Sequence, residues 1–434
     1  MHPQTIPGER LPLAGSLWSA TANDVPARPR VEGEIETDCV VVGAGFAGLS
    51  AALHVAESGR RVSVLEAYTP GWGASGRNGG QVNPGLKLDP VAAEAVLGKS
   101  VGPRAVAASG AGADLVFGLI RKHGIRCDAV QGGWVRAARS RRNLARLQNS
   151  ARQWRDRQQA VDDLDGTALE ALLGTGAYVG GVIDRRGGNL HPLNYALGLA
   201  VAAESAGAVI HGDSSVIDVR AASDEVVVAT ERGLVRAKKA LICTNAYTRG
   251  LLDPLGRAVV PVTSVQVATD PVSDTLAKRI LPEGHSPSDT RRLLVYFRKD
   301  ADGRFIMGGR GALSDRHVRQ RQQALRDEAV ALFPQLGRVR WRYAWGGDVA
   351  MTRNHLPLLH RVAPTVMVGI GFNGRGVAMA TVLGRILADW ASGCPAQDLD
   401  FPVNTPTPIP FHRYRRLGLG ATVAVFRALD RFKL

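Results

Sequence analysis

The segment Thr37–Glu66 places the strongest constraint on how this chain folds. Its apolar run Val40–Val42 predicts a parallel strand that is buried on both faces. A glycine-rich turn and the stretch LSAALHVAE follow and predict a helix, and VSVLE predicts a second strand. Strand, helix and strand in this order form a βαβ unit, so the sequence predicts an α/β fold with a Rossmann-like parallel sheet.

The turn of this unit has the G-x-G-x-x-G spacing of a dinucleotide site. Gly43 permits the sharp turn, Gly45 lets a pyrophosphate approach the backbone, and Gly48 lets the helix pack closely on the sheet. The helix start directs N–H groups and a partial positive charge at the phosphates. Glu66 ends the second strand, where a carboxylate accepts a hydrogen bond from a ribose hydroxyl and repels the 2′-phosphate of NADP. The expected contacts are Gly43, Gly45, Phe46, Ala47, Gly48, Glu66 and Ala67.

The alternative is a plain βαβ crossover whose glycines serve packing alone. We favour the dinucleotide site because strand, glycines, helix, second strand and acid all occur in the expected order.

Length and composition indicate a globular protein of two domains. The chain has 434 residues, which is long for a single domain. Its apolar content of 45% and charged content of 21% are ordinary for globular proteins. No apolar stretch is long enough to cross a bilayer, and the first residues lack the apolar core of a secretory signal. We therefore expect a cytoplasmic protein.

The cysteines support the same location. Cys39, Cys127, Cys243 and Cys394 are scattered and form no C-x-x-C pair. This pattern suits a reducing compartment and predicts no metal site.

The net charge of +15 has two interpretations. It could serve a nucleic acid, an anionic membrane surface or an acidic substrate. It could also reflect a general richness in arginine, because the arginines are spread along the whole chain. No basic block is interleaved with aromatic residues, so we favour the second interpretation and expect no nucleic-acid partner.

A second glycine-rich stretch, residues 71–87, follows the βαβ unit. Its sequence GWGASGRNGGQVNPGLK excludes an ordinary helix or strand, and its donors suit a phosphate or the edge of a flavin ring. A flexible surface loop is the alternative. Together GAGFAG, Glu66 and GWGASGRNGGQ resemble the D-amino-acid-oxidase-like (DAO) family of FAD-dependent amine oxidoreductases, and within it the γ-glutamylputrescine oxidoreductase group.

The resemblance implies non-covalent FAD in a domain with a parallel sheet of the glutathione-reductase type, and a second α+β domain on a mixed or antiparallel sheet. The loop at 71–87 would then cover the flavin ring and the pyrophosphate. From it we expect contacts by Ala74, Ser75, Arg77, Asn78, Gly79, Gly80 and Gln81. The resemblance also places Val216 beside the adenine, with Thr244 and Asn245 near the diphosphate.

The chain returns to the first domain near its end. Residues 365–393 read as an apolar strand, a glycine turn GFNGRG and a helix, so a second helix start faces something that is or becomes negative. The resemblance identifies that object as the N1–C2=O edge of the flavin. The residues expected there are Gly371, Asn373, Gly374, Arg375 and Gly376. Whether Arg375 adds a charge at this edge or points to solvent stays open.

Between these parts, segments after residue 257 alternate apolar and polar residues, as half-solvated antiparallel strands do. We predict an N-terminal arm at 1–36, an FAD-binding domain of 37–99, 185–256 and 345–400, a substrate domain of 100–184 and 257–344, and a basic C-terminal helix within 401–434. Trp18 is the expected anchor of the arm. The C-terminal helix either docks on its own domain, which we favour, or touches an anionic membrane.

No Ser-His-Asp, Cys-His or metal-ligand spacing stands out, which suits an enzyme whose cofactor carries the difficult step. The resemblance implies hydride transfer from the carbon beside a neutral amine to flavin N5, hydrolysis of the imine and transfer of electrons to oxygen or another acceptor. Tyr296, Arg298 and Trp345 are the candidate substrate contacts. Arg298 would hold a substrate carboxylate or lie on the surface, and Trp345 would line the cavity or fill the core.

Two departures from the sarcosine-oxidase pattern limit the analogy. No cysteine follows the second domain's strands closely, so a covalent cysteinyl flavin is not expected. Val377 and Ala378 stand where that branch has a lysine, which leaves oxidase and dehydrogenase open.

We therefore expect an FAD-dependent oxidase of a primary or secondary amine, of amino-acid or γ-glutamyl polyamine type. The alternatives are a membrane-associated dehydrogenase that passes electrons to a quinone, and a non-catalytic flavin-binding protein.

Overall fold

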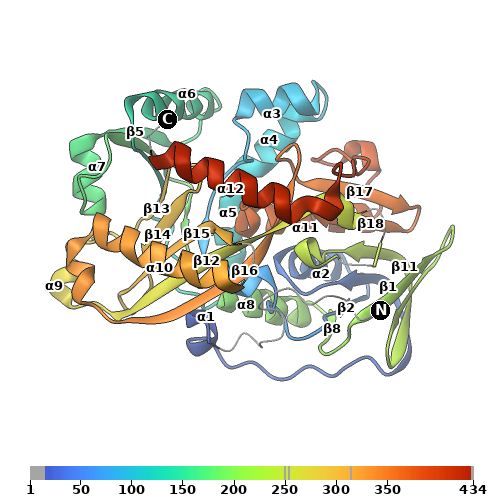
Figure 1. Ribbon diagram of the computed structural model, residues 1–434. Helices are drawn as coiled ribbons and strands as arrows, with labels where there is room; N and C mark the ends of the chain where they lie inside the picture. Colours follow the sequence, from blue (N-terminus) through green and yellow to red (C-terminus); the bar gives the residue numbers. More distant parts are fainter. Residues whose placement is uncertain (1–14, 249–250, 253–254, 313–314, 432–434) are drawn as a thin grey trace.

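The computed structural model describes residues 15–248, 251–252, 255–312 and 315–431. These residues form two eight-stranded sheets with helices packed on them (Figure 1). This architecture confirms the expected fold class, a Rossmann-like α/β domain with a second domain on a mixed sheet.

The first sheet has a parallel centre made from distant parts of the chain. Strands β1 (Gly33–Val42) and β2 (Val62–Leu65) are the two strands of the predicted βαβ unit. Strand β1 lies between β2 and β11 (Gly233–Ile242), which comes about two hundred residues later, and both pairings are parallel. An antiparallel strand closes one edge, and two more extend the sheet as a meander. The strands are β17 (Leu358–Ala363), β18 (Val366–Ile370), β11 (Gly233–Ile242), β1 (Gly33–Val42), β2 (Val62–Leu65) and β8 (Val209–His211), with β10 (Val226–Thr230) and β9 (Val216–Ala221) beside β11.

Helices cover this sheet so closely that small residues are required between them. An alanine Cβ at Gly384 would lie 2.4 Å from the Ala47 carbonyl oxygen, so helices α2 and α11 cross at a glycine. Ten of the twelve residues of α2 are buried, as expected for a helix between a sheet and other helices. The helices of this layer are α2 (Phe46–Glu57), α5 (Gly112–Lys122), α8 (Pro192–Ser205) and α11 (Gly376–Ala391).

The second sheet is antiparallel except where β13 pairs with β4. Its core contains the aromatic cluster Phe297, Phe305 and Phe333, whose ring centroids lie 5.5–6.0 Å apart. Helix α10 (Asp315–Leu332) packs on this sheet. The strands in order are β16 (Trp341–Thr352), β12 (Val259–Pro271), β15 (Arg304–Ala312), β14 (Val295–Lys299), β13 (Ser286–Asp289), β4 (Trp134–Ala138), β6 (Gly180–Asp184) and β5 (Val161–Asp165).

The remaining elements are short or peripheral. They are α1 (Leu17–Ala20), β3 (Gln81–Val82), α3 (Pro90–Leu97), α4 (Gly102–Gly110), α6 (Arg141–Arg155), α7 (Gly166–Leu173), β7 (Gly188–Asn189), α9 (Asp274–Ala277) and α12 (Arg415–Arg431).

Several element bounds differ from the prediction. Helices α4 and α5 lie within the range assigned to the substrate domain, but their buried residues belong to the same core as α2 and α11 rather than to the second sheet. Strand β1 begins at Gly33, inside the predicted arm, and β16 runs across the boundary drawn at residues 344 and 345. The exact domain boundaries therefore stay a prediction.

The described part of the N-terminal arm is fastened by Trp18. Its side chain is fully buried, and its ring makes edge contacts with His191 and Trp345. The indole N–H donates to the Asn78 carbonyl oxygen at 2.8 Å. The arm thus braces the second glycine-rich stretch from outside the cavity.

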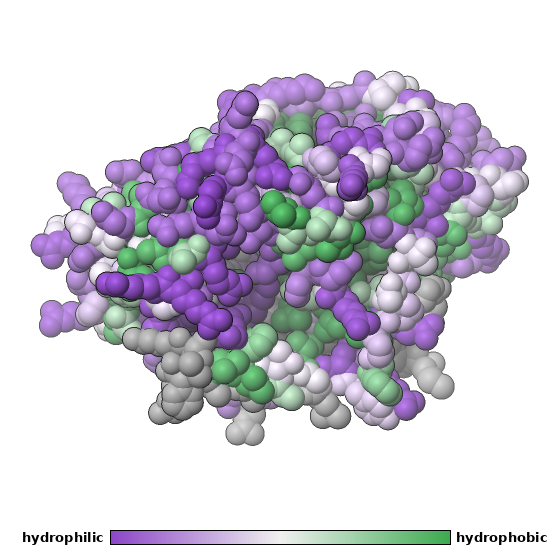
Figure 2. Space-filling model, turned by 90° about the horizontal axis from the view of Figure 1, so that it is seen from above, coloured by the Kyte–Doolittle hydropathy of each residue, from purple (hydrophilic) through white to green (hydrophobic). Residues whose placement is uncertain are grey.

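The C-terminal segment returns to the start of β12. The Ile409 N–H donates to the Arg257 carbonyl oxygen, and His412 bonds with the Val259 carbonyl oxygen. Helix α12 then crosses the front of the molecule as drawn in Figure 1. Seen from above, the surface is mostly hydrophilic with hydrophobic residues in scattered groups (Figure 2). Among the described helices, none is both long and apolar enough to span a membrane.

Candidate active site

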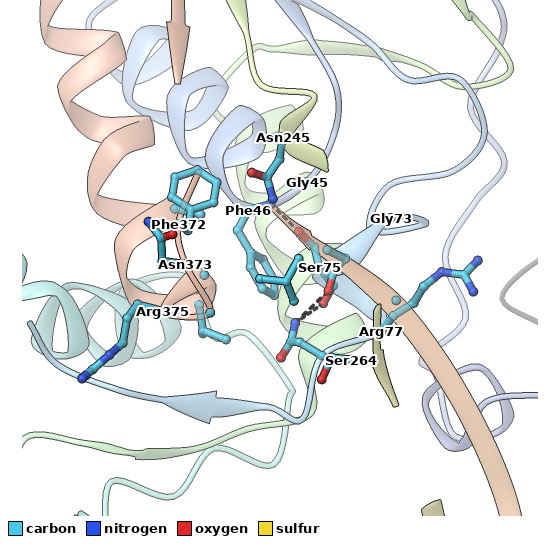
Figure 3. Close-up of a pocket in the computed structure, with 18 of the residues that line it drawn as sticks. Gly45, Phe46, Gly73, Ser75, Arg77, Asn245, Ser264, Phe372, Asn373 and Arg375 are labelled. Atoms are coloured by element: carbon cyan, nitrogen blue, oxygen red, sulfur yellow. Dashed lines mark hydrogen bonds between the residues drawn. The ribbon is translucent and has the colours of Figure 1, made fainter. Parts of the chain in front are cut away.

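A cavity of about 1360 Å³ lies between the two sheets and takes residues from both. Ligand pockets are commonly about 300–1,000 Å³, so this cavity has room for a large cofactor and a substrate together. Figure 3 shows residues from the two glycine turns, Gly45 and Asn373, facing one space, with Ser264 on the opposite wall.

The first glycine turn forms a cradle at one end of the cavity. Gly43 has a φ of +100°, and Gly45 caps the start of α2. A Cβ at Gly45 would lie 2.9 Å from Ser75 Oγ, and one at Gly48 would lie 1.9 Å from the Gly43 carbonyl oxygen. The Phe46 N–H donates to Ser75 Oγ at 2.9 Å (Figure 3). The bare backbone and helix start suit a pyrophosphate, as the spacing predicted.

Glu66 lies at the edge of this cradle. Its carboxylate accepts hydrogen bonds from the N–H groups of Ala44 at 2.8 Å and Tyr68 at 3.1 Å. Burial raises the pKa of Glu66 above its usual range, and the backbone donors oppose that shift. The carboxylate is therefore held rigidly, and Ala67 and Val216 line the same part of the cavity.

The second glycine-rich stretch is ordered by its own hydrogen bonds, which argues against a flexible surface loop. The Asn78 side chain donates to the carbonyl oxygens of Ala74 and Ser75 and accepts from the Gly80 N–H. Arg77 donates to the Trp72 carbonyl oxygen at 2.8 Å and lies over that indole ring. The residues of this stretch that line the cavity include Ala74, Ser75, Arg77, Asn78, Gly79 and Gln81.

The two glycine turns converge on one place. Asn245, just after β11, accepts from the Gly371 N–H at 2.9 Å. Asn373 has a φ of +54°, and its side chain is fixed by Thr352 and by the Gly371 carbonyl oxygen. Because β11 and β18 are parallel, their carboxyl ends meet at this edge, which is where α/β sheets bind ligands. Thr244, Gly374 and Gly376 line the cavity beside them.

Three of the predicted cofactor residues do not line the cavity. They are Gly48, Gly80 and Gly371. Each supports the site indirectly, because only glycine fits there. An added Cβ would collide with the Gly43 carbonyl oxygen, the Leu190 carbonyl oxygen and a methyl group of Thr352, respectively.

Arg375 does not point to solvent. It donates to the Pro84 carbonyl oxygen at 2.6 Å and lies over the Trp134 ring at 4.5 Å. Figure 3 shows it extending away from Gly45 and Ser75. Burial is the main cause that lowers its pKa to about 9. It lines the cavity beside Gly374 and Gly376, and its charge at the flavin edge stays a prediction.

Tyr296 is the one predicted substrate contact that lines the cavity. Its hydroxyl lies 3.0 Å from Ser264 Oγ of β12, and both residues line the cavity from the second sheet. Burial raises the pKa of Tyr296, so the phenol stays protonated and able to donate a hydrogen bond.

The prediction that Arg298 holds a substrate carboxylate is wrong. Arg298 is buried behind the cavity wall and donates to the carbonyl oxygens of Gly79 at 2.8 Å and Leu190 at 2.7 Å, and to Asn189 Oδ1 at 2.8 Å. Its guanidinium also lies over Trp18 at 5.0 Å. Strand alternation placed it on the same face as Tyr296, but Gly79 and Leu190 already occupy its donors. Arg298 is therefore a structural brace.

Trp345 fills the core. It is 6% exposed, contacts the Trp18 ring and donates to the Arg77 carbonyl oxygen at 3.0 Å. Of the two roles considered for Trp345, the packing supports filling the core and not lining the cavity.

The sequence reasoning missed several polar residues that line the cavity. Gln266 is fully buried, and neither atom of its amide has a hydrogen-bond partner among the described residues. The alternation of VTSVQVATD, which places Ser264 and Gln266 on one face of β12, was the available signal. Lys87, Arg136 and Arg310 also line the cavity and come from three different elements.

Lys87 gives the site a pH dependence. The Lys87 side chain is exposed and lines the cavity. Desolvation by the surrounding protein, together with Arg310, Arg375 and Arg136, lowers the pKa of Lys87 to about 7, while Asp89 opposes the shift. In the unfolded chain its pKa is about 10.4, so between these values the unfolded state binds more protons. We expect the Lys87 contribution to make the protein more stable as pH rises from 7 towards 10.

Thermal unfolding of the native protein and of Lys87→Met at pH 7, 8 and 9 checks this. The native protein should gain melting temperature relative to the variant as the pH increases. A difference that stays constant over this range would contradict the lowered pKa.

The residues at the cradle fit FAD. The α2 start, a rigid carboxylate and a glycine-bare backbone would hold its phosphates and ribose, and the α11 start faces the same cavity. The Gln266 amide, which has no partner among the described residues, offers hydrogen bonds on the second-sheet side. No group of three or more potential metal ligands occurs within the described ranges.

Comparison with known proteins decides the family. The model of the FAD dependent oxidoreductase family (DAO) matches residues 38–390. The chain belongs to the DAO family of FAD-dependent oxidoreductases. This confirms the family, the enzyme class and the cofactor that the sequence predicted.

Individual DAO relatives extend the match over most of the chain. Gamma-glutamylputrescine oxidoreductase of Escherichia coli is 31% identical over 417 residues, which cover 95% of this chain and 97% of the relative. A probable oxidoreductase of Haemophilus influenzae, OrdL, is 35% identical over 81% of this chain and 82% of its own. Glycine oxidase from Geobacillus kaustophilus shares the fold, with a TM-score of 0.69, 22% identity and coverage of 82% and 95%.

Proposed function

We propose that this DAO enzyme oxidises a primary or secondary amine, of γ-glutamyl polyamine or amino-acid type, and passes the electrons to oxygen. The observation that carries the proposal is the end-to-end similarity to gamma-glutamylputrescine oxidoreductase, together with a cavity large enough for a cofactor and an extended substrate. The cytoplasmic location stays a prediction.

The chain's own residues supply binding and orientation. Bound FAD supplies the two-electron acceptor for the C–H bond beside the amine nitrogen. The start of α11 and the Asn373 turn place backbone N–H groups at one wall of the cavity, where they favour negative charge. On the second sheet, Tyr296 and Ser264 form a hydroxyl pair that supports a role in orienting the substrate.

The arrangement of the chain supports an assignment of roles to its parts. We assign FAD binding to 37–99, 185–256 and 345–400, with α4 and α5 packed on that part, and substrate binding to the strands of 100–184 and 257–344. The cavity takes residues from both, as a site that joins a cofactor to a substrate requires.

The test is an anaerobic screen of amines against the purified holoenzyme. γ-Glutamylputrescine, putrescine, glycine, sarcosine and proline are each added, and loss of the flavin absorbance reports reduction. We expect γ-glutamylputrescine or an amino acid to bleach the flavin, and air to restore the absorbance with formation of hydrogen peroxide. A flavin that no amine bleaches would contradict the proposal.

A dehydrogenase that works at a membrane is the second candidate. It is favoured by exposed apolar side chains in and beside α12, because Phe411 is 80%, Tyr414 50% and Val425 54% exposed next to several arginines. Flotation with phosphatidylglycerol vesicles, and flavin reoxidation by a soluble quinone in place of air, separate this candidate from the oxidase.

A further inference from the structure

Three consecutive carbonyl oxygens of the second glycine-rich stretch are held by side chains behind the cavity wall. The Arg77 carbonyl oxygen accepts from Trp345 Nε1 at 3.0 Å, that of Asn78 from Trp18 Nε1 at 2.8 Å, and that of Gly79 from Arg298 Nε at 2.8 Å. The three acceptor residues line the cavity, whereas the three donors are buried and do not line it. The carbonyl groups therefore point away from the cavity.

The direction of each carbonyl group fixes the direction of the N–H group in the same peptide. In a planar trans peptide the C=O and N–H bonds point in nearly opposite directions. The N–H groups that follow these carbonyl groups are therefore turned away from the buried donors. Two of them find acceptors inside the stretch, because the Asn78 N–H donates to the Ala74 carbonyl oxygen at 3.1 Å and the Gly80 N–H donates to Asn78 Oδ1 at 2.8 Å.

The Gly79 N–H differs from both of these neighbours. It donates to no other residue in the part of the chain that the structure describes, although Gly79 is buried. Its peptide is the one whose carbonyl oxygen is held by Trp18, so the N–H faces the cavity that Gly79 lines. Buried backbone N–H groups are almost always paired, so this one indicates an acceptor on a ligand.

Trp18 is itself held in a fixed orientation. Its ring makes an edge contact with His191 at 4.9 Å, and the Arg298 guanidinium lies over it at 5.0 Å. His191 Nδ1 accepts from the Asn194 N–H, so Nε2 carries the hydrogen and lies 3.0 Å from Thr21 Oγ1. Burial and Arg298 lower the pKa of His191 to about 3, so this contact stays neutral over the working pH range.

FAD supplies acceptors that suit the Gly79 N–H, because its ring carries carbonyl oxygens and unprotonated nitrogens. The stretch reaches the phosphate cradle through Ser75, whose Oγ accepts from the Phe46 N–H at 2.9 Å (Figure 3). It then continues along the cavity wall to Gly79, away from the end where phosphates would bind. A rigidly held donor is best matched by a rigid acceptor, which favours the flavin ring over the ribityl chain.

We propose that Trp18 is a positioning residue for the flavin, because it turns the peptide between Asn78 and Gly79 so that the Gly79 N–H donates a hydrogen bond to the flavin ring. A donor fixed in advance favours the electron-rich reduced ring over the oxidised ring, since it needs no rearrangement as charge develops. The N-terminal arm thus tunes the cofactor from outside the cavity. This inference depends on FAD binding and not on which amine is oxidised.

The test compares Trp18→Phe with Trp345→Phe in the holoenzyme, since each removes one buried indole N–H and keeps an aromatic ring. Trp18→Phe should raise the FAD dissociation constant by about twofold to tenfold, the range for one hydrogen bond. It should also shift the visible flavin bands and lower the two-electron midpoint potential by up to about 30 mV, which corresponds to a tenfold change. Trp345→Phe should leave all three unchanged, because the Asn78 N–H that it affects is bound to Ala74.

A second control separates Trp18 from the rest of the arm. Arg28→Met removes the ion pair of the arm with Glu204, which is 2.7 Å long, and leaves Trp18 in place. This variant should lose stability but keep the native flavin spectrum and potential. Equal shifts in either control variant would overturn the proposal, because general loosening of the stretch would then be responsible.

Two further results would overturn the proposal. One is a native dissociation constant, spectrum and potential in Trp18→Phe. The other is weaker FAD binding with an unchanged spectrum, because the acceptor would then lie on the ribityl chain and not on the ring. Failure of every amine in the substrate screen would leave the proposal intact, since none of these measurements uses a substrate.

Hydrogen–deuterium exchange of the native chain keeps the test open if the variants do not fold. Exchange is followed by mass spectrometry with single-residue resolution, with and without bound FAD. The Gly80 N–H is bonded inside the stretch in either case, whereas the Gly79 N–H depends on the ligand. We expect FAD to slow exchange at Gly79 at least about tenfold more than at Gly80. Equal slowing at the two residues would contradict a hydrogen bond from Gly79.

Discussion

Gly48→Ala should abolish FAD binding and destabilise the protein by about 3 kcal/mol or more, above the usual range for overpacking. The added Cβ would lie 1.9 Å from the Gly43 carbonyl oxygen, and 3.1 Å from the Gly43 carbonyl carbon and a methyl group of Val41. The closest of these atoms, the Gly43 carbonyl oxygen, belongs to the backbone of the turn and not to a flexible side-chain end, so α2 must move away from β1. The measurements are the visible spectrum of the purified protein and its denaturant midpoint.

Gly118→Ala provides the matched control. Gly118 lies inside helix α5, and an added Cβ there would meet no atom within 4 Å. Because alanine favours a helix interior, this variant should gain about 0.5–1 kcal/mol and keep its colour. A Gly48→Ala protein that is yellow and as stable as the native one would show that α2 does not need its close contact with β1.

Arg298→Met should cost about 3–5 kcal/mol of stability, because each buried acceptor left without a donor costs about 1–3 kcal/mol. The change leaves the Gly79 and Leu190 carbonyl oxygens and Asn189 Oδ1 without their donor and removes the contact with Trp18. Arg298→Lys should not restore stability, because a single ammonium group cannot reproduce the planar fork. Denaturant unfolding of the three proteins measures the effect.

Arg220→Met is the control for loss of charge. Arg220 pairs with Asp218 on the surface, where its side chain is 79% exposed, so the change should cost no more than about 1 kcal/mol. If Arg298→Met instead kept native stability and raised KM for an amine selectively, Arg298 would contact substrate and the structural assignment would be wrong.

The sequence revealed the parts of the fold that depend on local patterns. The βαβ unit has a buried apolar strand, glycines that only a tight turn and close packing require, and a terminal acid, and these signals agree with one another. The return through β18 and α11 carries the first two of these signals, the buried apolar strand and the glycine turn. By contrast β13, SPSD, has no strand-like composition and contains Pro287, so its place between β14 and β4 depends on tertiary contacts.

The substrate side of the site was less predictable, for a geometric reason. Alternation placed Tyr296 and Arg298 on one face of β14, but it could not show that the cavity ends between them and that the Gly79 backbone covers the second. Lys87 and Arg136 gave no local signal, because each looks like one more cation in a basic chain. The fold, and not the local sequence, brings Arg136 to the Trp134 ring and brings Lys87 within electrostatic reach of Arg136, Arg310 and Arg375.

The central sheet also determines when the molecule can assemble during synthesis. Val40 of β1 pairs with Ala240 of β11, which in turn pairs with Val366 of β18. On the ribosome, β1 and β2 are therefore made long before β11, the partner of β1, and β18, the partner of β11. Until then the open strand edges invite pairing with other chains, so we expect folding to be slow and largely post-translational, and products truncated before β18 to aggregate.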